Sequence, residues 1–389
     1  MSNRTKKSNR STVKFGDFAE NVAVRIDPAE AKTDIYVGLE HLDPQSLHLK
    51  KWGHPSDVTG QKLVFKKGDV IFGRRRAYQR KLAIAQFDGI CSAHAMVVRA
   101  KPDMILPEFL PFFLQSDMFM ERAIGISVGS LSPTINWRTL KVQEFRIPLI
   151  EEQKRIAEIL WAADETVAGW ESVYEYASAA LQSYVDRTFF CPTAGHKALA
   201  VGEICTIQCG FAFKSRDYQD AGIPLIRISN VKEPYVDVAE RTVFLPDAFV
   251  SENPSFVLQK GDLLIALSGA TTGKIGIYNS DKKALLNQRV GRLVYKDSSP
   301  ISKALTTQVF YSFRDRILGD AYGGAQPNIS PRDIEKYTIY VPKIGLVATE
   351  ATVQAMVRSR DSAKDQLLAS VHLVAVLRNM LVSEGGPVA

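Results

Sequence analysis

The sequence of 389 residues contains only four cysteines: Cys91, Cys191, Cys205 and Cys209. Thiols this sparse and unevenly spaced do not form a disulfide framework, which indicates a reducing compartment. No apolar run approaches the roughly 18 residues that a membrane helix requires. The N-terminal segment, MSNRTKKSNR, lacks the hydrophobic centre of a secretory signal. The sequence therefore predicts a cytoplasmic protein with no membrane partner.

The signatures of catalysis are also missing. The segment GATTGKIG at 269–276 is similar to a phosphate-binding loop, but Ser268 replaces its first glycine and Ile275 replaces its magnesium-binding Ser/Thr. Adenine-methyltransferase, nuclease, helicase and zinc-deaminase motifs are not found. One alternative zinc set consists of Cys191, His196, Cys205 and Cys209. That spacing matches no common zinc pattern. From these missing motifs together, we expect no catalytic residue and no bound metal or cofactor in this chain.

Positive charge is concentrated in two blocks of the sequence. The formal net charge is +7, from 49 Lys/Arg and 42 Asp/Glu. Residues 1–149 carry 23 basic against 15 acidic residues, and residues 191–345 carry 19 against 15. Between them, residues 150–190 carry 3 against 8, and residues 346–389 carry 4 of each. This distribution indicates two separate surfaces for a polyanionic partner.

The chain is an internal duplication. The segment KKGDVIFGRRRAYQRKLAIA at 66–85 corresponds without a gap to QKGDLLIALSGATTGKIGIY at 259–278, at a spacing of 193 residues. The correspondence resumes at a spacing of 194, where Gly129, Pro133, Ile135, Arg138 and Pro148 match Gly323, Pro327, Ile329, Arg332 and Pro342. A chain of this length also exceeds what one hydrophobic core usually serves. The sequence therefore predicts two copies of one unit.

Each copy predicts the same order of elements. Short apolar runs separated by Gly, Asp and Pro indicate strands, and a helical patch follows at 107–125 and at 301–319. Each copy ends in a long stretch almost free of helix breakers, at 149–191 and at 346–384. Apolar residues recur there at a three-then-four spacing, which is typical of a coiled-coil seam. The predicted interface residues are Ile156, Leu160, Val167, Trp170, Tyr174 and Leu181 in the first stretch and Leu367, Val374, Leu377 and Leu381 in the second.

The predicted fold class is α+β. Two β-rich globular domains with helices lie in pseudo-twofold tandem and are separated by two long antiparallel helices that form a coiled coil. The predicted segments are a first domain at 1–148, a first helix at 149–191, a second domain at 192–343, a second helix at 344–384 and a tail at 385–389. Each helix would be about 60 Å long at 1.5 Å per residue. An open alternative is that each helix docks independently on its own domain.

The turn between two predicted strands is the strongest candidate for contact with DNA. In the first copy it is GRRRAYQRK, which contributes Arg74, Arg75, Arg76, Tyr78, Arg80 and Lys81; in the second it is ALSGATTGK, which contributes Ser268, Thr271, Thr272 and Lys274. A shared framework with divergent tips is what two modules that recognise different DNA sequences would show. Weaker candidates are Ser130, Ser132 and Asn136 in the first copy and Lys214, Arg216, Gln288, Arg289, Gln326 and Asn328 in the second. The arginine run could instead be a solvated face, and each weaker candidate could instead cap a helix or close a turn.

Together these features resemble a known family. The tandem blocks with their KGD strand openings, and the segment IPLIEEQKRIAEIL at 147–160, resemble the DNA-specificity subunit of type I restriction-modification systems. The likeness covers residues 15–384. The counterpart segment, VPKIGLVATEATVQAM at 341–356, lacks the Glu-Gln-Lys of the first copy, so the second junction is divergent.

The resemblance implies a non-catalytic subunit. Each domain would be a target-recognition domain for one half of a bipartite, asymmetric site in double-stranded DNA, and the helices would set the spacer between the halves. Two methyltransferase subunits would dock around the helices and use S-adenosylmethionine. Restriction and translocase subunits that use ATP and Mg could join them. Two alternatives stay open: the recognition part of a self-sufficient methyltransferase or nuclease, and a scaffold that binds DNA without sequence specificity.

Overall fold

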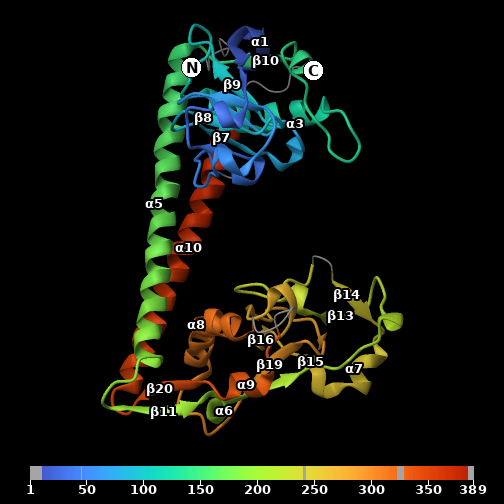
Figure 1. The fold of residues 1–389 in the computed structure, drawn as a ribbon, viewed down its shortest axis with the longest axis vertical. Coiled ribbons are helices and arrows are strands. Elements are labelled where there is room, and N and C mark those ends of the chain that lie inside the picture. Colours follow the sequence, from blue (N-terminus) through green and yellow to red (C-terminus); the bar gives the residue numbers. More distant parts are fainter. Residues whose placement is uncertain (1–10, 45, 240–241, 322–327, 384–389) are drawn as a thin grey trace, which may run out of the picture. The chain divides into compact units, whose positions relative to one another are not determined.

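The chain forms two compact units in the computed structural model (Figure 1). The structure describes residues 11–44, 46–239, 242–321 and 328–383. Unit 1 comprises residues 1–172 and 364–389, and unit 2 comprises residues 173–363. Each unit therefore contains one copy of the repeat and a part of each long C-terminal stretch.

Unit 1 contains three β-sheets. Its strands are β1 (Ser11–Lys14), β2 (Ala19–Asn21), β3 (Arg25–Ile26), β4 (Tyr36–Val37), β5 (Lys62–Phe65), β6 (Val70–Phe72), β7 (Leu82–Ile84), β8 (Gly89–Cys91), β9 (Met96–Ala100) and β10 (Glu144–Ile147). The central sheet is antiparallel, in the order β2-β9-β6-β7. The second sheet has the order β3-β5-β8-β4, with β4 and β8 parallel. Strands β1 and β10 form the third sheet.

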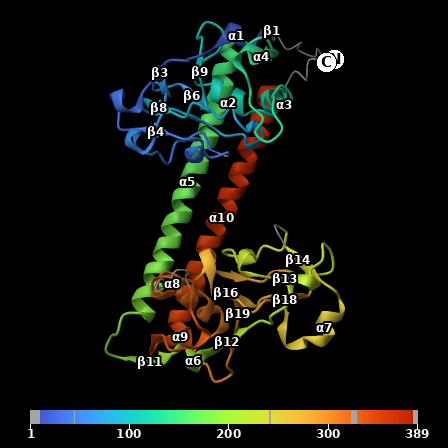
Figure 2. The same ribbon diagram turned by 45° about the vertical axis from the view of Figure 1, so that its right-hand side comes forward.

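Unit 2 repeats this arrangement. Its strands are β11 (His196–Ala200), β12 (Cys205–Cys209), β13 (Ile223–Ile226), β14 (Val243–Leu245), β15 (Val257–Leu258), β16 (Leu263–Ala266), β17 (Ile275–Ile277), β18 (Ala284–Leu286), β19 (Val290–Tyr295) and β20 (Thr338–Pro342). The sheets are β12-β19-β16-β17, β14-β13-β18-β15 and β11-β20. Strands β13 and β18 are the parallel pair and lie side by side in Figure 2.

The structural repeat confirms the duplication predicted from the sequence. In the hairpin of each central sheet, Val70 pairs with Ile84 and Leu263 pairs with Ile277, both at the spacing of 193 residues. One strand differs between the units. In unit 1, β3 extends the second sheet beyond β5, whereas in unit 2, β14 extends it beyond β13 at the opposite edge.

The central sheet of each unit is buried on both faces. Val70 and Phe72 face a core that includes helices, whereas Ile71 between them faces the second sheet. Successive side chains of a strand point to opposite faces, so a strand buried on both sides becomes continuously apolar. Leu263 and Leu264 divide in the same way between two cores of unit 2. Each unit therefore has three layers: sheet, sheet and helices.

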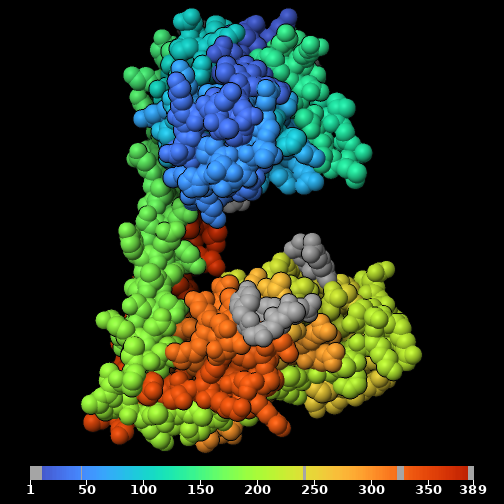
Figure 3. Space-filling view, viewed as in Figure 1, coloured from blue at the N-terminus to red at the C-terminus, as the bar shows by residue number. Residues whose placement is uncertain are grey.

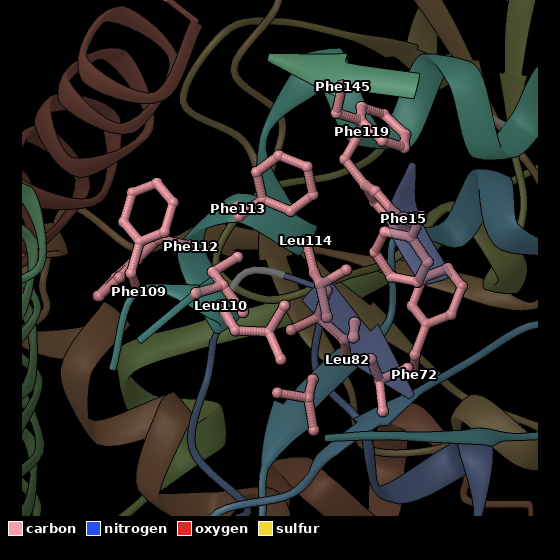
Figure 4. Close-up of a cluster of buried hydrophobic side chains, with 14 of the residues drawn as sticks. Phe15, Phe72, Leu82, Phe109, Leu110, Phe112, Phe113, Leu114, Phe119 and Phe145 are labelled. Atoms are coloured by element: carbon pink, nitrogen blue, oxygen red, sulfur yellow. The ribbon is translucent and has the colours of Figure 1, made fainter. Parts of the chain in front are cut away.

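Phenylalanine side chains dominate the helical core of unit 1 (Figure 4). The helices of this unit outside the long stretches are α1 (Phe15–Phe18), α2 (Leu110–Gln115), α3 (Asp117–Gly125) and α4 (Trp137–Leu140). The single helical patch predicted at 107–125 is two helices, because the hydroxyl of the buried Ser116 accepts a hydrogen bond from Phe119 N and caps α3. Phe113 lies between Phe18 and Phe145, with ring centroids 5.4 and 5.3 Å away.

Several helices pack in the core of unit 2 that includes its central sheet. The helices of this unit outside the long stretches are α6 (Val201–Ile204), α7 (Ala248–Glu252), α8 (Lys303–Ala321) and α9 (Pro331–Glu335). Helix α8 matches the second predicted patch, and its buried Phe310 and Phe313 pack in the core beside Ile265.

The KGD motif shared by the two copies forms a structural turn. Gly68 has a φ of +92°, a conformation that glycine adopts without strain. The Asp69 carboxylate accepts a hydrogen bond from Lys66 N at 2.8 Å and pairs with Arg99 on β9 at 2.7 Å. The corresponding residues of the second copy are Gly261, Asp262 and Arg292. The glycine and the aspartate of the motif therefore maintain the framework of each unit.

The two long helices occur where the sequence predicts them. Helix α5 spans Ile150–Phe189, with 40 residues, and helix α10 spans Leu346–Ser383, with 38 residues. An 18-residue window of α10 has a mean hydropathy of 1.4, so, contrary to the expectation from the sequence, this helix is long and apolar enough to cross a membrane by length and composition alone. However, Val353 and Val382, near its two ends, are buried in the cores of units 2 and 1. Core helices of globular proteins pass the same test.

Candidate nucleic-acid interface

The hairpin β6–β7 of unit 1 ends in a tip formed by residues 73–81, which we call tip 1. Gly73 N donates a hydrogen bond to Lys81 O at 2.8 Å and closes the tip. Arg76 and Arg80 have φ values of +56° and +53° and flank a short 3-10 helix, Ala77–Gln79. Left-handed backbone is unfavourable for residues other than glycine, at a cost of about 1–3 kcal/mol each, and is retained only where surrounding contacts enforce it. The conformation of tip 1 is therefore enforced by the contacts around it.

Two segments that follow the parallel strands of unit 1 support tip 1. Parallel strands end at the same edge of a sheet, so residues 38–41 after β4 and residues 92–95 after β8 leave together. Lys81 Nζ donates to Leu39 O at 2.9 Å. Arg74 Nη2 donates to Ala93 O at 3.0 Å, and Arg75 Nη1 donates to His94 Nε2 at 3.2 Å.

A fourth segment, residues 128–135, lies against the other side of tip 1. Arg76 N donates to Pro133 O at 2.7 Å, and Ile135 N donates to Arg74 O at 3.0 Å. The Arg76 side chain donates to Ser132 Oγ at 3.3 Å. This hydrogen bond brings together two predicted candidates, Arg76 and Ser132. Ser130 and Asn136 are exposed in or beside the same segment.

The five cations of tip 1 fall into two groups. Arg75 and Arg76 are partly or fully exposed, as is Tyr78, and Arg74 is half-buried. Arg80, by contrast, forms an ion pair with Asp117 at the start of α3. Arg80 is paired with Asp117, and Lys81 donates to a backbone carbonyl. These two side chains therefore stabilise the tip.

Burial and, after it, positive charge lower two pKa values at tip 1. Burial, followed by the nearby Arg25, lowers the pKa of Arg74. Burial, followed by the charges of Arg75 and Arg74, lowers the pKa of His94, which favours the neutral imidazole. Sequence reasoning missed both His94 and Arg25, because they are distant from the arginine run along the chain. Because Nε2 accepts from Arg75, the neutral imidazole of His94 keeps one donor, the Nδ1 N–H, for a partner.

Tip 2 comprises residues 266–274 between β16 and β17. The Thr271 hydroxyl donates to Ile228 O at 3.1 Å, and the Thr272 hydroxyl donates to Gly269 O at 2.7 Å. Thr272 is only 3% exposed. Thr272 was predicted to contact DNA, but its side chain is buried and its hydroxyl stabilises the turn. Lys274 is half-buried.

The segments around tip 2 correspond to those around tip 1. Residues 227–230 follow β13 and residues 287–289 follow β18, and Leu267 N donates to Arg289 O at 3.0 Å. Ser268 forms an isolated β-bridge with Asn328, and Ile329 N donates to Leu267 O at 3.0 Å. Gln326, another predicted candidate, lies outside the described residues.

The other candidates of unit 2 are surface residues. Lys214 and Arg216 are exposed in the segment between Phe213 and Tyr218. Gln288 and Arg289 are exposed directly after β18. Gln288 and Arg289 thus belong to a segment that surrounds tip 2, whereas Lys214 and Arg216 belong to the segment that adjoins it.

The alternative zinc set is dispersed in unit 2. Cys205 is buried in β12, where burial raises its pKa to about 12, whereas Cys191 is exposed. The His196 imidazole is hydrogen-bonded to the hydroxyl of Thr193. Over the part of the chain that the structure describes, no three His, Cys, Asp or Glu residues form a group that could hold a metal.

The sequence matches a family model in both repeats. The model is that of the type I restriction modification DNA specificity domain, and it matches residues 53–169 and 196–345. The chain belongs to this family. The fold thus far described is that of a DNA specificity protein: two α+β domains in tandem, connected by long helices.

Curated specificity subunits and solved structures resemble this specificity protein. The type I restriction enzyme MjaVIII specificity subunit of Methanocaldococcus jannaschii is 24% identical over 82% of this chain and 78% of its own length. The EcoDI specificity subunit of Escherichia coli is 27% identical over 41% of this chain and 36% of its own length. A chain from a study of assembly and conformational transition of the type I R-M system has a TM-score of 0.57 at 18% identity, covering 96% of this chain and 97% of its own. The S subunit from M. genitalium has a TM-score of 0.53 at 15% identity, with 98% of each chain covered.

The predicted interface residues of this specificity protein follow one covered stripe on each long helix. Three of them lie fully within a unit's core: Ile156 and Leu160 in unit 1 and Leu181 in unit 2. The half-buried members are Val167, Trp170 and Tyr174 on α5 and Leu367, Val374, Leu377 and Leu381 on α10. The start of α5 shares its core with the end of α10, and the end of α5 shares its core with the start of α10. The ends of both stripes therefore pack within the cores of the units.

Proposed function

We propose that this chain is the DNA-recognition subunit of a type I restriction-modification complex. Unit 1 contacts double-stranded DNA through tip 1 and the segments around it, and unit 2 does so through tip 2 and its own surrounding segments. Each unit recognises one half of a bipartite, asymmetric site. The family membership and the length of the match to curated specificity subunits support this role.

One observation carries the proposal. Four corresponding segments meet at the tip of each unit, but their side chains differ. Tip 1 presents Arg75 and Arg76 beside His94, whereas the surroundings of tip 2 present Gln288 and Arg289. Arginine recognises guanine edges and phosphates, and amides favour adenine edges. A constant framework with different polar groups is suited to recognising two different half-sites.

The chemistry of the complex belongs to partner subunits under this proposal. Two methyltransferase subunits dock on the long helices and use S-adenosylmethionine, and restriction or translocase subunits use ATP and Mg. Helix α5 leaves part of its surface uncovered (Figure 3). On this helix, Tyr176 is 77% exposed and Val173 is 47% exposed. Exposed apolar side chains on a helix are suited to a protein partner. The chain itself acts as a non-catalytic subunit, in the cytoplasm where the chromosome lies.

Mapping methylated bases across the genome tests the proposal. Cells that carry the chain and cells from which it is deleted are compared. We expect a methylated motif of two short blocks separated by an unspecified spacer, present only when the chain is present. Methylation that is unchanged by the deletion would refute the role. A motif with a single contiguous block would refute the assignment of one half-site to each unit.

A scaffold without sequence specificity makes a different prediction. Its binding to duplex DNA arises from phosphate contacts alone, so it falls steeply for every sequence as salt rises from 50 to about 200 mM. For this chain, we expect duplexes that contain the mapped motif to stay bound at about 150 mM salt and to outcompete scrambled duplexes.

A further inference from the structure

A cavity of about 290 Å³ lies beside tip 2. The residues that line it are Phe213, Tyr218, Arg227, Ile228, Ser229, Asn287, Gln288 and Arg289. Strands β13 and β18 are parallel, so the segments after them enter the cavity from the same sheet edge. Gly210 permits a third segment to pass close by, because a Cβ at this position would lie 2.0 Å from Leu286 O. The fold thus places two arginines and two amides around one recess.

The corresponding recess of unit 1 is occupied by the chain's own cations. There, Arg74 reaches Ala93 O and Lys81 reaches Leu39 O, in the segments that follow β8 and β4. The residue of tip 2 that corresponds to Arg74 is Leu267, which is only 4% exposed and packs in the core. In unit 2, the cations that line the recess are Arg227 and Arg289, from the segments after β13 and β18. Among the described residues, the lining includes none of tip 2.

The lining of the cavity favours an electron-rich partner. Its members within the described chain include no carboxylate. The exposed side chains of Gln288 and Arg289 form no hydrogen bond or ion pair with any residue that the structure describes. Asn287 is held in place, since its Oδ1 accepts from Arg289 N at 3.4 Å. Sites for cofactors and other small molecules usually measure about 300–1,000 Å³, so a cavity at the lower limit is better suited to the edge of one base.

We propose that Arg289 recognises a guanine in the half-site of unit 2. This inference rests on the proposed function and names one of its contacts. A guanidinium can donate two hydrogen bonds to guanine N7 and O6, an arrangement of acceptors that other bases lack in the major groove. Gln288, the adjacent residue of the lining, is available to contact the neighbouring base.

A change of one residue in the native complex tests the assignment. The chromosomal gene is replaced by alleles encoding Arg289→Ala or Lys260→Ala, and methylated motifs are mapped. Lys260 is an equally charged, exposed residue of unit 2 that pairs with Asp281 outside the cavity. We expect Arg289→Ala to relax one guanine position in one block, with the other block intact, and Lys260→Ala to leave the motif unchanged. A motif unchanged by Arg289→Ala would overturn the inference, as would a motif relaxed in both blocks.

A base analogue tests the atoms involved. The complex, purified through a tag on this chain, is titrated with duplexes in which that guanine is replaced by 7-deazaguanine, which lacks the N7 acceptor. We expect the wild-type complex to lose roughly 5- to 150-fold in affinity, and the Arg289→Ala complex to lose almost nothing further. Equal losses in both complexes would overturn the inference. The absence of any two-block motif in wild-type cells would instead refute the proposed function, so the two failures are distinguishable.

Discussion

Asp117 connects tip 1 to the second long helix, and its removal should destabilise unit 1. Its carboxylate pairs with Arg80 of tip 1 and accepts a hydrogen bond from Asn379 Nδ2 of α10 at 2.6 Å. Its backbone N donates to Asn379 Oδ1 at 3.0 Å. Beside it, Arg378 Nη1 donates to Gln115 Oε1 at 3.0 Å. Two segments more than 260 residues apart are thus joined at one carboxylate.

The magnitudes favour the contact with α10 over the ion pair. Arg80 and Asp117 are 37% and 42% exposed in their side chains, so their pair is worth about 0–1 kcal/mol after solvent screening. The hydrogen bond from Asn379 to a charged acceptor is worth about 1.5 kcal/mol or more. A carboxylate in the first turn of a helix adds roughly 0.3–1 kcal/mol. We therefore expect Asp117→Ala to lower the free energy of unfolding of unit 1 by about 2–3 kcal/mol, and Arg80→Ala by about 1 kcal/mol or less.

Tryptophan fluorescence in urea measures unit 1 selectively. All four tryptophans, Trp52, Trp137, Trp161 and Trp170, belong to this unit. Asp281→Ala, which removes an 86% exposed carboxylate from unit 2, is the matched control and should leave the fluorescence transition in place. If Asp117→Ala shifts the transition no more than Arg80→Ala does, the connection to α10 contributes no stability and the reasoning is refuted.

Three further predictions concern separate parts of the molecule. Alanine at positions 74–76 should relax the methylated motif in the block recognised by unit 1 alone; relaxation of both blocks would contradict two independent units. The hydrogen bond to Asp164 raises the pKa of His48, so the stabilisation is complete below the unfolded-state value of about 6.5 and is lost as pH rises through the folded-state pKa. The fluorescence transition should therefore fall more between pH 6 and pH 9 in the wild type than in His48→Gln, and identical slopes would count against this pair. Phe113→Ala should cost unit 1 about 3–5 kcal/mol and shift the fluorescence transition, whereas Phe313→Ala should cost unit 2 as much and shift only the circular dichroism; a fluorescence shift in the second variant would show that the units do not unfold separately.

Local patterns in the sequence were sufficient to predict much of the fold. The repeat spacing identified the hairpins β6–β7 and β16–β17, because a strand, a turn and a second strand are contiguous in the chain. The three-then-four spacing predicted α5 and α10, since a helix that buries one stripe must repeat apolar residues at that period. The break at Ser116 was missed because the capping role of a hydroxyl depends on backbone geometry.

The candidate interface was less predictable, because its residues are sorted by contacts between distant segments. Arg76 and Arg80 belong to one run of the sequence, yet Arg80 is engaged by Asp117, 37 residues away. Likewise, Thr271 and Thr272 belong to one polar run, but both hydroxyls are used by nearby backbone carbonyls. No periodicity in the sequence encodes such pairings. The internal repeat did indicate where to look, since it aligned the two tips before any contact was known.

The division of the chain has a consequence for the order of synthesis. Unit 2 is one continuous segment, residues 173–363, whereas unit 1 needs residues from both ends of the chain. The core of unit 1 includes Val382, which is only 1% exposed, with Leu377 and Leu381 packed against it. A ribosome therefore delivers every residue of unit 2 before it delivers the last strip of the unit 1 core. The half of the molecule that is translated first is therefore the half whose core is completed last.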